Sequence, residues 1–193
     1  MIGVYAYRPN PVQGSFAVTA VLSPLFCAWL VAAVEREVGP SAGAILTVAA
    51  GGAERAWRGR LALIAIVSAA VTVVFLVWPT ATGAFDRNPG AGDLIAAGVA
   101  HLACGAFGGA LALVVAAPVR TATAFAAVLM TIIGSIALAH PLGAIAGPGA
   151  VARALDASPV DAVSGRLAAA CVVTLAEAAA LAYGARRLAR WRG

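Results

Sequence analysis

Two of the few side chains that could do chemistry lie inside long apolar segments. Glu177 stands within CVVTLAEAAALAYG and His101 within GVAHLACGAFGGALA. An acid inside a membrane span costs about 3 kcal/mol, so it usually faces a cavity or a partner. Glu177 could contact a substrate or a proton, or it could pair with a hydroxyl or backbone group of a neighbouring span. For His101, which has no metal-ligand pattern around it, a structural role is expected and no metal site is predicted.

Other kinds of chemistry have no basis in the sequence. It contains no HExxH, no GxSxG and no paired acids within its apolar segments, so an enzyme is not expected. All 13 basic residues are arginines. Without a lysine the chain cannot carry a standard P-loop, so no ATP site or other cofactor is predicted in it. Cys27, Cys104 and Cys171 stand in apolar segments without a CxxC pair, and we interpret them as buried thiols.

The composition is that of a polytopic membrane protein. Apolar residues make up 62% of the 193 residues and charged residues 11%, against roughly 25% in soluble domains. The net charge of +5 then fits loops facing anionic headgroups, and no nucleic acid partner is expected. A helix needs about 20 apolar residues to cross a bilayer, and only helices or closed barrels satisfy the backbone there. We predict one all-α transmembrane domain of about five spans, at residues 15–34, 61–78, 93–117, 121–139 and 165–185.

The arginines predict an orientation. Nine fall in one set of alternate loops and four in the other, which places the N-terminus outside and the C-terminus inside. The first set contains Arg36, Arg55, Arg58, Arg60, Arg120, Arg186, Arg187, Arg190 and Arg192, and the second Arg8, Arg87, Arg153 and Arg166.

Glycines and prolines predict how the spans pack and where one loop breaks. Small residues allow close helix contact, which is expected at Gly98, Gly105, Gly108 and Gly109. The outer loop at residues 140–163 is mostly apolar and is interrupted by Gly147-Pro148 and Pro159, so we expect a re-entrant or interfacial pair of half-helices there.

One charged stretch follows the first span. Glu35, Arg36 and Glu37 come first, and Gly39-Pro40 is expected to break the helix. Residues 41–50 are apolar but too short to cross, so they should lie along the inner membrane face, and Gly51-Gly52 should end them. Taken alone, these charges could be interfacial anchors that set the topology.

The order of these elements resembles the ABC type-2 permease family, the membrane subunits of a class of ABC exporters. In that family, an acidic pair and Gly-Thr are followed by a coupling helix, a small-residue turn and Gly-Lys. The similar positions in this sequence are Glu35-Arg36-Glu37 for the acidic pair, Gly39-Pro40 for Gly-Thr, residues 45–47 for the coupling helix and Gly59-Arg60 for Gly-Lys. The turn at residues 118–120, the broken outer loop and the basic tail are also similar. The resemblance implies that an ATPase contacts Glu35, Arg36, Glu37, Gly39, Ile45, Leu46, Thr47 and Arg55.

The resemblance also implies partners. An ATP-binding subunit would hold ATP and Mg²⁺, and a second membrane subunit, the same chain or another, would complete the permease. The family has six spans behind an amphipathic elbow helix, whereas this chain lacks the elbow and the first span. A small separate subunit could supply them, or the chain is a shortened variant. The expected location is the bacterial cytoplasmic membrane. The alternative function is a non-transporting scaffold or assembly subunit of a larger complex.

Overall fold

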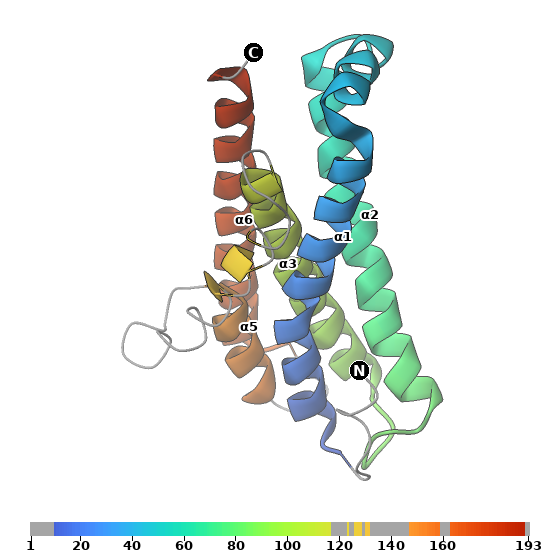
Figure 1. Cartoon of the computed structure of the whole chain (residues 1–193). Coiled ribbons are helices and arrows are strands. Elements are labelled where there is room, and N and C mark those ends of the chain that lie inside the picture. Colours follow the sequence, from blue (N-terminus) through green and yellow to red (C-terminus); the bar gives the residue numbers. More distant parts are fainter. Residues whose placement is uncertain are drawn as a thin grey trace.

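A computed structural model describes residues 10–116, 123, 126–128, 130–131, 147–158 and 163–191 (Figure 1). These residues form α-helices joined by turns, as predicted. The helices are α1 Val12–Ala49, α2 Ala53–Ala81, α3 Ala91–Ala116, α5 Gly147–Asp156 and α6 Gly165–Trp191.

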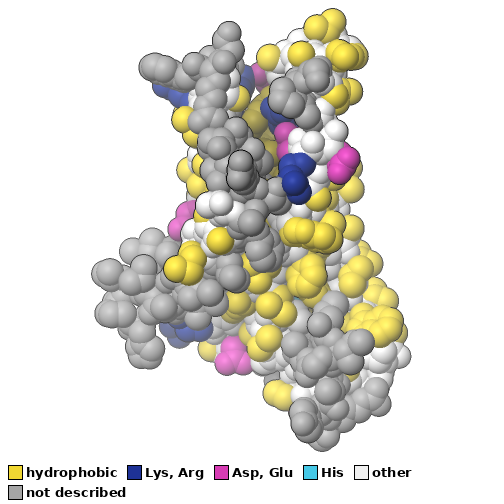
Figure 2. Space-filling view, viewed as in Figure 1, with side chains coloured by type: hydrophobic (Ala, Val, Ile, Leu, Met, Phe, Trp, Pro, Cys, Tyr) yellow, Lys and Arg dark blue, Asp and Glu magenta, His cyan; other side chains and the backbone are white. Residues whose placement is uncertain are grey.

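Four of the described helices are long and apolar enough to cross a membrane. Their candidate spans are Val12–Val38, Ala53–Ala81, Ala91–Val115 and Gly165–Ala189, which cover the predicted first, second, third and fifth spans. The predicted span at 121–139 lies mostly outside the described residues, although 123, 126–128, 130 and 131 are helical. In Figure 2 apolar side chains cover much of the middle of the molecule, and charged side chains gather mainly toward its two ends. The chain is therefore a multi-pass helical membrane protein.

Helix α3 is the centre of the bundle. It packs against α1, α2, α5 and α6, and 67% of its apolar window is buried inside the protein, against 28% for α2 and for α6. Helices α1, α3 and α6 run in one direction and α2 runs back (Figure 1). One end of the bundle therefore carries the turn between α1 and α2 and the C-terminal end of α6. We call it the hairpin end. Which end faces the cytoplasm stays a prediction.

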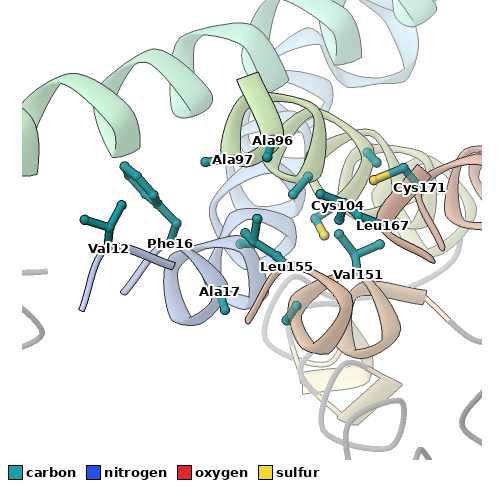
Figure 3. Close-up of a cluster of buried hydrophobic side chains, with 14 residues drawn as sticks. Val12, Phe16, Ala17, Ala96, Ala97, Cys104, Val151, Leu155, Leu167 and Cys171 are labelled. Carbon is teal, nitrogen blue, oxygen red and sulfur yellow. The ribbon is translucent and has the colours of Figure 1, made fainter. Parts of the chain in front are cut away.

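Two apolar clusters fill the interior. The first lies toward the end opposite the hairpin and joins α1, α3, α5 and α6 (Figure 3). Its members include Phe16, Ala97, Cys104, Val151, Leu155, Leu167 and Cys171. The second lies toward the hairpin end and includes Val31, Trp57, Ile64, Phe107, Leu111, Ala178 and Ala182. All three cysteines are free and buried, as expected.

Glycines of α3 set the closest helix crossings. A Cβ on Gly108 would lie 2.2 Å from the carbonyl oxygen of Pro24, so the α1 backbone crosses α3 directly on this residue. At Gly109 the nearest atom would be Ile64 Cγ2 of α2, at 2.9 Å. Gly105 is similarly crowded, whereas a Cβ on Gly98 would meet only ordinary contact at 3.6 Å. The predicted close approach is therefore confirmed at three of the four glycines.

The predicted helix break at Gly39-Pro40 is wrong. Helix α1 continues through both residues and ends only at Ala49, so residues 41–50 do not form a separate coupling helix. Proline inside a helix bends it without always ending it. The sequence signal thus marks a place where α1 can bend, and the helix continues past it to Ala49.

Helix lengths show that α1 must bend beyond Glu35. The Glu35 carboxylate pairs with Arg60 of α2 at 3.1 Å. From this pair α1 runs on for about 21 Å to Ala49, whereas α2 reaches back only about 10 Å to Ala53. A straight α1 would overshoot the start of α2, so the last turns of α1 must lean across toward it (Figure 1).

Helix α5 is the described part of the predicted broken loop. It begins at Gly147-Pro148, where proline fits because the first turn needs no N–H donors, and it buries Val151 and Leu155 against α1, α3 and α6. The half-helix expected before it falls on residues outside the described ones. Re-entry of this loop into the bilayer stays a prediction.

Candidate functional site: the hairpin end and the buried polar groups

Two glycines close the hairpin between α1 and α2. The N–H of Gly52 donates to the carbonyl of Thr47 at 2.9 Å, and the N–H of Gly51 donates to that of Val48 at 2.9 Å. These two bonds form a Schellman motif, which requires a left-handed residue at its turn. Gly51 has φ +77° and Gly52 φ +121°, so both positions favour glycine. The prediction that Gly51-Gly52 ends the apolar segment is confirmed.

An apolar surface caps this hairpin. Ile45 is 69% exposed, Leu46 51% and Val48 80%. Thr47 is half-buried, and its hydroxyl donates to the carbonyl of Gly43 at 2.8 Å, so it stabilises α1 locally. We call Ile45, Leu46 and Val48 the apolar tip.

The charges around the tip divide into paired and unpaired groups. Glu35 of α1 pairs with Arg60 of α2. Arg36 and Glu37 are exposed, and Glu37 forms no ion pair with another described residue. Arg55 folds back over the turn, because a Cβ on Gly51 would lie 2.5 Å from its Nη1. Among ion pairs of the described residues, Glu35 is the one predicted coupling residue that connects two helices.

The sequence did not identify Glu54 as a connecting residue. Its carboxylate pairs with Arg186 of α6 and lies 3.6 Å from Arg58 in its own helix. The spacing of Glu54 and Arg58, four residues apart, could have revealed the second pair. Arg186 follows Glu54 by 132 residues, and no local signal connects them.

His101 is wholly buried and hydrogen-bonded on both ring nitrogens. Nδ1 lies 2.7 Å from the carbonyl of Ala97, and Nε2 lies 3.0 Å from the hydroxyl of Thr19 in α1. A carbonyl only accepts, so Nδ1 must carry a proton. In a neutral ring the Thr19 hydroxyl then donates its single proton to Nε2, in place of the Phe16 carbonyl 3.1 Å away. The rings of Phe16 and Phe75 pack around the imidazole. The expected structural role for His101 thus has a definite form: it fastens α1 to α3.

Glu177 lies in the middle of α6, beside the start of α5. Its carboxyl group interacts with the backbone N–H of Gly147, the first residue of α5. A carboxylate is favoured at a helix N-terminus, where backbone N–H groups are unpaired. Gly147 does not belong to a candidate span, so the two alternatives for Glu177 stay predictions. Oε2 of Glu177 and the Thr174 hydroxyl have no hydrogen-bond partner among the described residues. No hydrogen bond or ion pair of the described residues joins Glu177 to His101.

Comparisons with known proteins add no relative. No family model, no curated protein and no solved structure matches the chain. The fold and the site therefore define a class, a multi-pass helical membrane protein with a bent helical hairpin at one end.

Proposed function

We propose that the chain is the membrane-spanning permease subunit of an ABC-type exporter, and that the apolar tip docks on a separate ATPase subunit. The exposure of Ile45, Leu46 and Val48 at the end of the hairpin carries this proposal. Exposed apolar side chains grouped at one place favour a protein or membrane contact. These side chains lie at the end of the hairpin, beyond the Glu35–Arg60 ion pair and its neighbouring arginines. This position favours contact with a peripheral protein over contact with the hydrocarbon of the bilayer. ATP and Mg²⁺ belong to that partner.

Two ion pairs provide a route for movement from the tip into the bundle. Glu35–Arg60 holds α1 against α2, and Glu54–Arg186 ties the start of α2 to the end of α6. A displacement of the hairpin would therefore pull on α6 as well as on α1. Rigid-body movement of packed helices is a common way to change which side of a membrane protein is open.

The wider assembly follows from the same proposal. A second membrane subunit, the same chain or another, completes the permease. The hairpin end faces the cytoplasm of a bacterial cell, with its arginines at the inner leaflet. Glu177 remains the intramembrane polar group that a substrate could approach, whereas His101 is wholly buried between helices.

Co-purification under mild solubilisation tests the docking of the ATPase. The wild-type chain should bring an ATP-hydrolysing subunit in fixed stoichiometry. Val48→Asp should lower the recovered ATPase about tenfold or more, because it removes an apolar contact and places a charge at the interface. Ala53→Asp is the matched control, since it adds the same charge close by, where an acid in the first helical turn is favourable. Equal loss from both variants, or no ATPase with the wild type, would contradict the proposal.

A second candidate is a non-transporting scaffold subunit. The observation that favours it is the continuous α1, which leaves no separate coupling helix beneath the membrane. A scaffold would bring down a stoichiometric partner without ATP turnover. If Val48→Asp lost this partner while the ATPase activity of the membrane stayed unchanged, the scaffold alternative would be favoured.

A further inference from the structure

One face of α6 points away from the bundle. Five exposed residues follow one another on it at intervals of three or four: Val172, Ala176, Ala179, Tyr183 and Arg187. Residues at this spacing share a helix face. The face is therefore apolar for most of its length and ends, at the hairpin end, on a tyrosine and an arginine one turn apart.

Tyr183 and Arg187 hold each other in place. Nε of Arg187 donates to the Tyr183 hydroxyl at 3.0 Å, and the guanidinium carbon lies 5.4 Å from the ring centroid. Tyr183 is itself 57% exposed, so the pair stands on the surface. A guanidinium held by both a hydroxyl and an aromatic face has already lost much of its freedom, which lowers the cost of binding a ligand.

Arg187 differs from the neighbouring Arg186 in its charge pairing. Arg186 points to Glu54 and is neutralised by it, whereas Arg187 has no carboxylate partner among the described residues. Among the described residues, hydrogen bonding engages only Nε of Arg187, so both terminal nitrogens still have donors to offer. Their planar arrangement matches two oxygens of a phosphate group.

We propose that Tyr183 and Arg187 bind the phosphate of an anionic phospholipid in the leaflet at the hairpin end. Tyrosine prefers the boundary between hydrocarbon and headgroups, and arginines beside membrane helices bind anionic headgroups there. The apolar face that leads up to the pair, through Val172 and Ala179, offers a surface for the acyl chains. A soluble phosphate would gain nothing from that face. This inference depends on membrane insertion and is independent of the exporter proposal.

Lipid binding can be measured on the intact chain. The protein is reconstituted in phosphatidylcholine nanodiscs with increasing phosphatidylglycerol, and bound phosphatidylglycerol is counted by native mass spectrometry after release. Arg187→Gln should weaken binding about fivefold, the effect of one arginine at a membrane surface. Arg166→Gln is the matched control, because Arg166 is an exposed arginine of the same helix near its other end. Circular dichroism confirms that both variants keep their helices.

Two milder variants separate a shaped site from general surface charge. Arg187→Lys keeps the charge without the planar fork, and Tyr183→Phe keeps the ring without the hydroxyl. Each should bind phosphatidylglycerol more weakly than wild type and more strongly than Arg187→Gln. Wild-type binding by Arg187→Gln or Arg187→Lys, an equal loss in Arg166→Gln, or competition by glycerol phosphate at lipid concentrations would each overturn the proposal.

Discussion

The α1–α3 crossing and the α1–α2 hairpin both depend on glycine, for opposite reasons. At the crossing, Gly108 has an ordinary helical backbone and is needed because Pro24 leaves no room for a side chain. At the hairpin, Gly51 has open space apart from Arg55 but a left-handed backbone. The first glycine supports contact between distant segments, and the second only redirects the chain.

Polar groups also differ between the two regions, in how deeply they are buried. Near the crossing, His101 is buried and has a partner for each ring nitrogen. At the hairpin end, Glu54 is half exposed and pairs with two arginines. A hydrogen bond away from water is costly to break, whereas an exposed ion pair contributes little to stability. The bundle interior should therefore carry the stability, and the hairpin end should be easier to displace.

The strongest test of this difference is Gly108→Ala. A Cβ would lie 2.2 Å from a backbone atom of α1, so the two helices would have to separate. Overpacking of this kind destabilises by about 3 kcal/mol, and the thermal midpoint in detergent should fall sharply. Gly98→Ala, whose nearest contact would be 3.6 Å away, is the control and should stay close to wild type. Equal midpoints for the two variants would mean that the crossing is looser than described here.

Gly51→Ala should have a smaller and more local effect. An alanine at φ +77° costs about 1–2 kcal/mol, and Arg55 would also have to move. The turn should become more sensitive to limited proteolysis, with a modest fall in the thermal midpoint. Gly51→Asn should be tolerated better, because asparagine adopts the left-handed conformation more readily. An alanine variant as resistant as wild type would argue against the Schellman turn.

The bond between His101 and Thr19 should be visible in a double-mutant cycle. Thr19→Val and His101→Leu each remove one partner, and the cycle should give a coupling energy of about 1 kcal/mol, as for other hydrogen bonds between membrane helices. Thermal or denaturant unfolding of the four proteins provides the measurement. Strictly additive effects would show that the two side chains do not support each other.

Glu54→Gln should change stability least. An exposed ion pair is worth under about 1 kcal/mol and is screened by salt, so the thermal midpoint should hardly move. Any fall should disappear at high salt. A fall as large as that of Gly108→Ala would mean that this ion pair, and not helix packing, holds α6 to the hairpin.

The helices could be predicted from local patterns because each one is encoded by its own residues. Apolar runs of sufficient length gave the four described spans, and Gly51-Gly52 gave the end of α1. The glycines of α3 indicated close contact, although Gly98 does not take part. Gly39-Pro40 misled because a proline signal inside a good helix can mean either an end or a bend. Only the packing around the proline decides whether the helix ends or bends there.

The candidate site was harder to predict because its contacts join distant residues. Glu35, Ile45 and Leu46 were predicted through the family resemblance, but the pairing of Glu54 with Arg186 and of His101 with Thr19 has no local signal. By itself the sequence determined that this is a helical membrane protein, which segments are long and apolar enough to cross, and at which loops arginine gathers. The tertiary structure decided which polar groups meet, because that depends on the angle and height at which helices pass one another, and helix periodicity does not specify either.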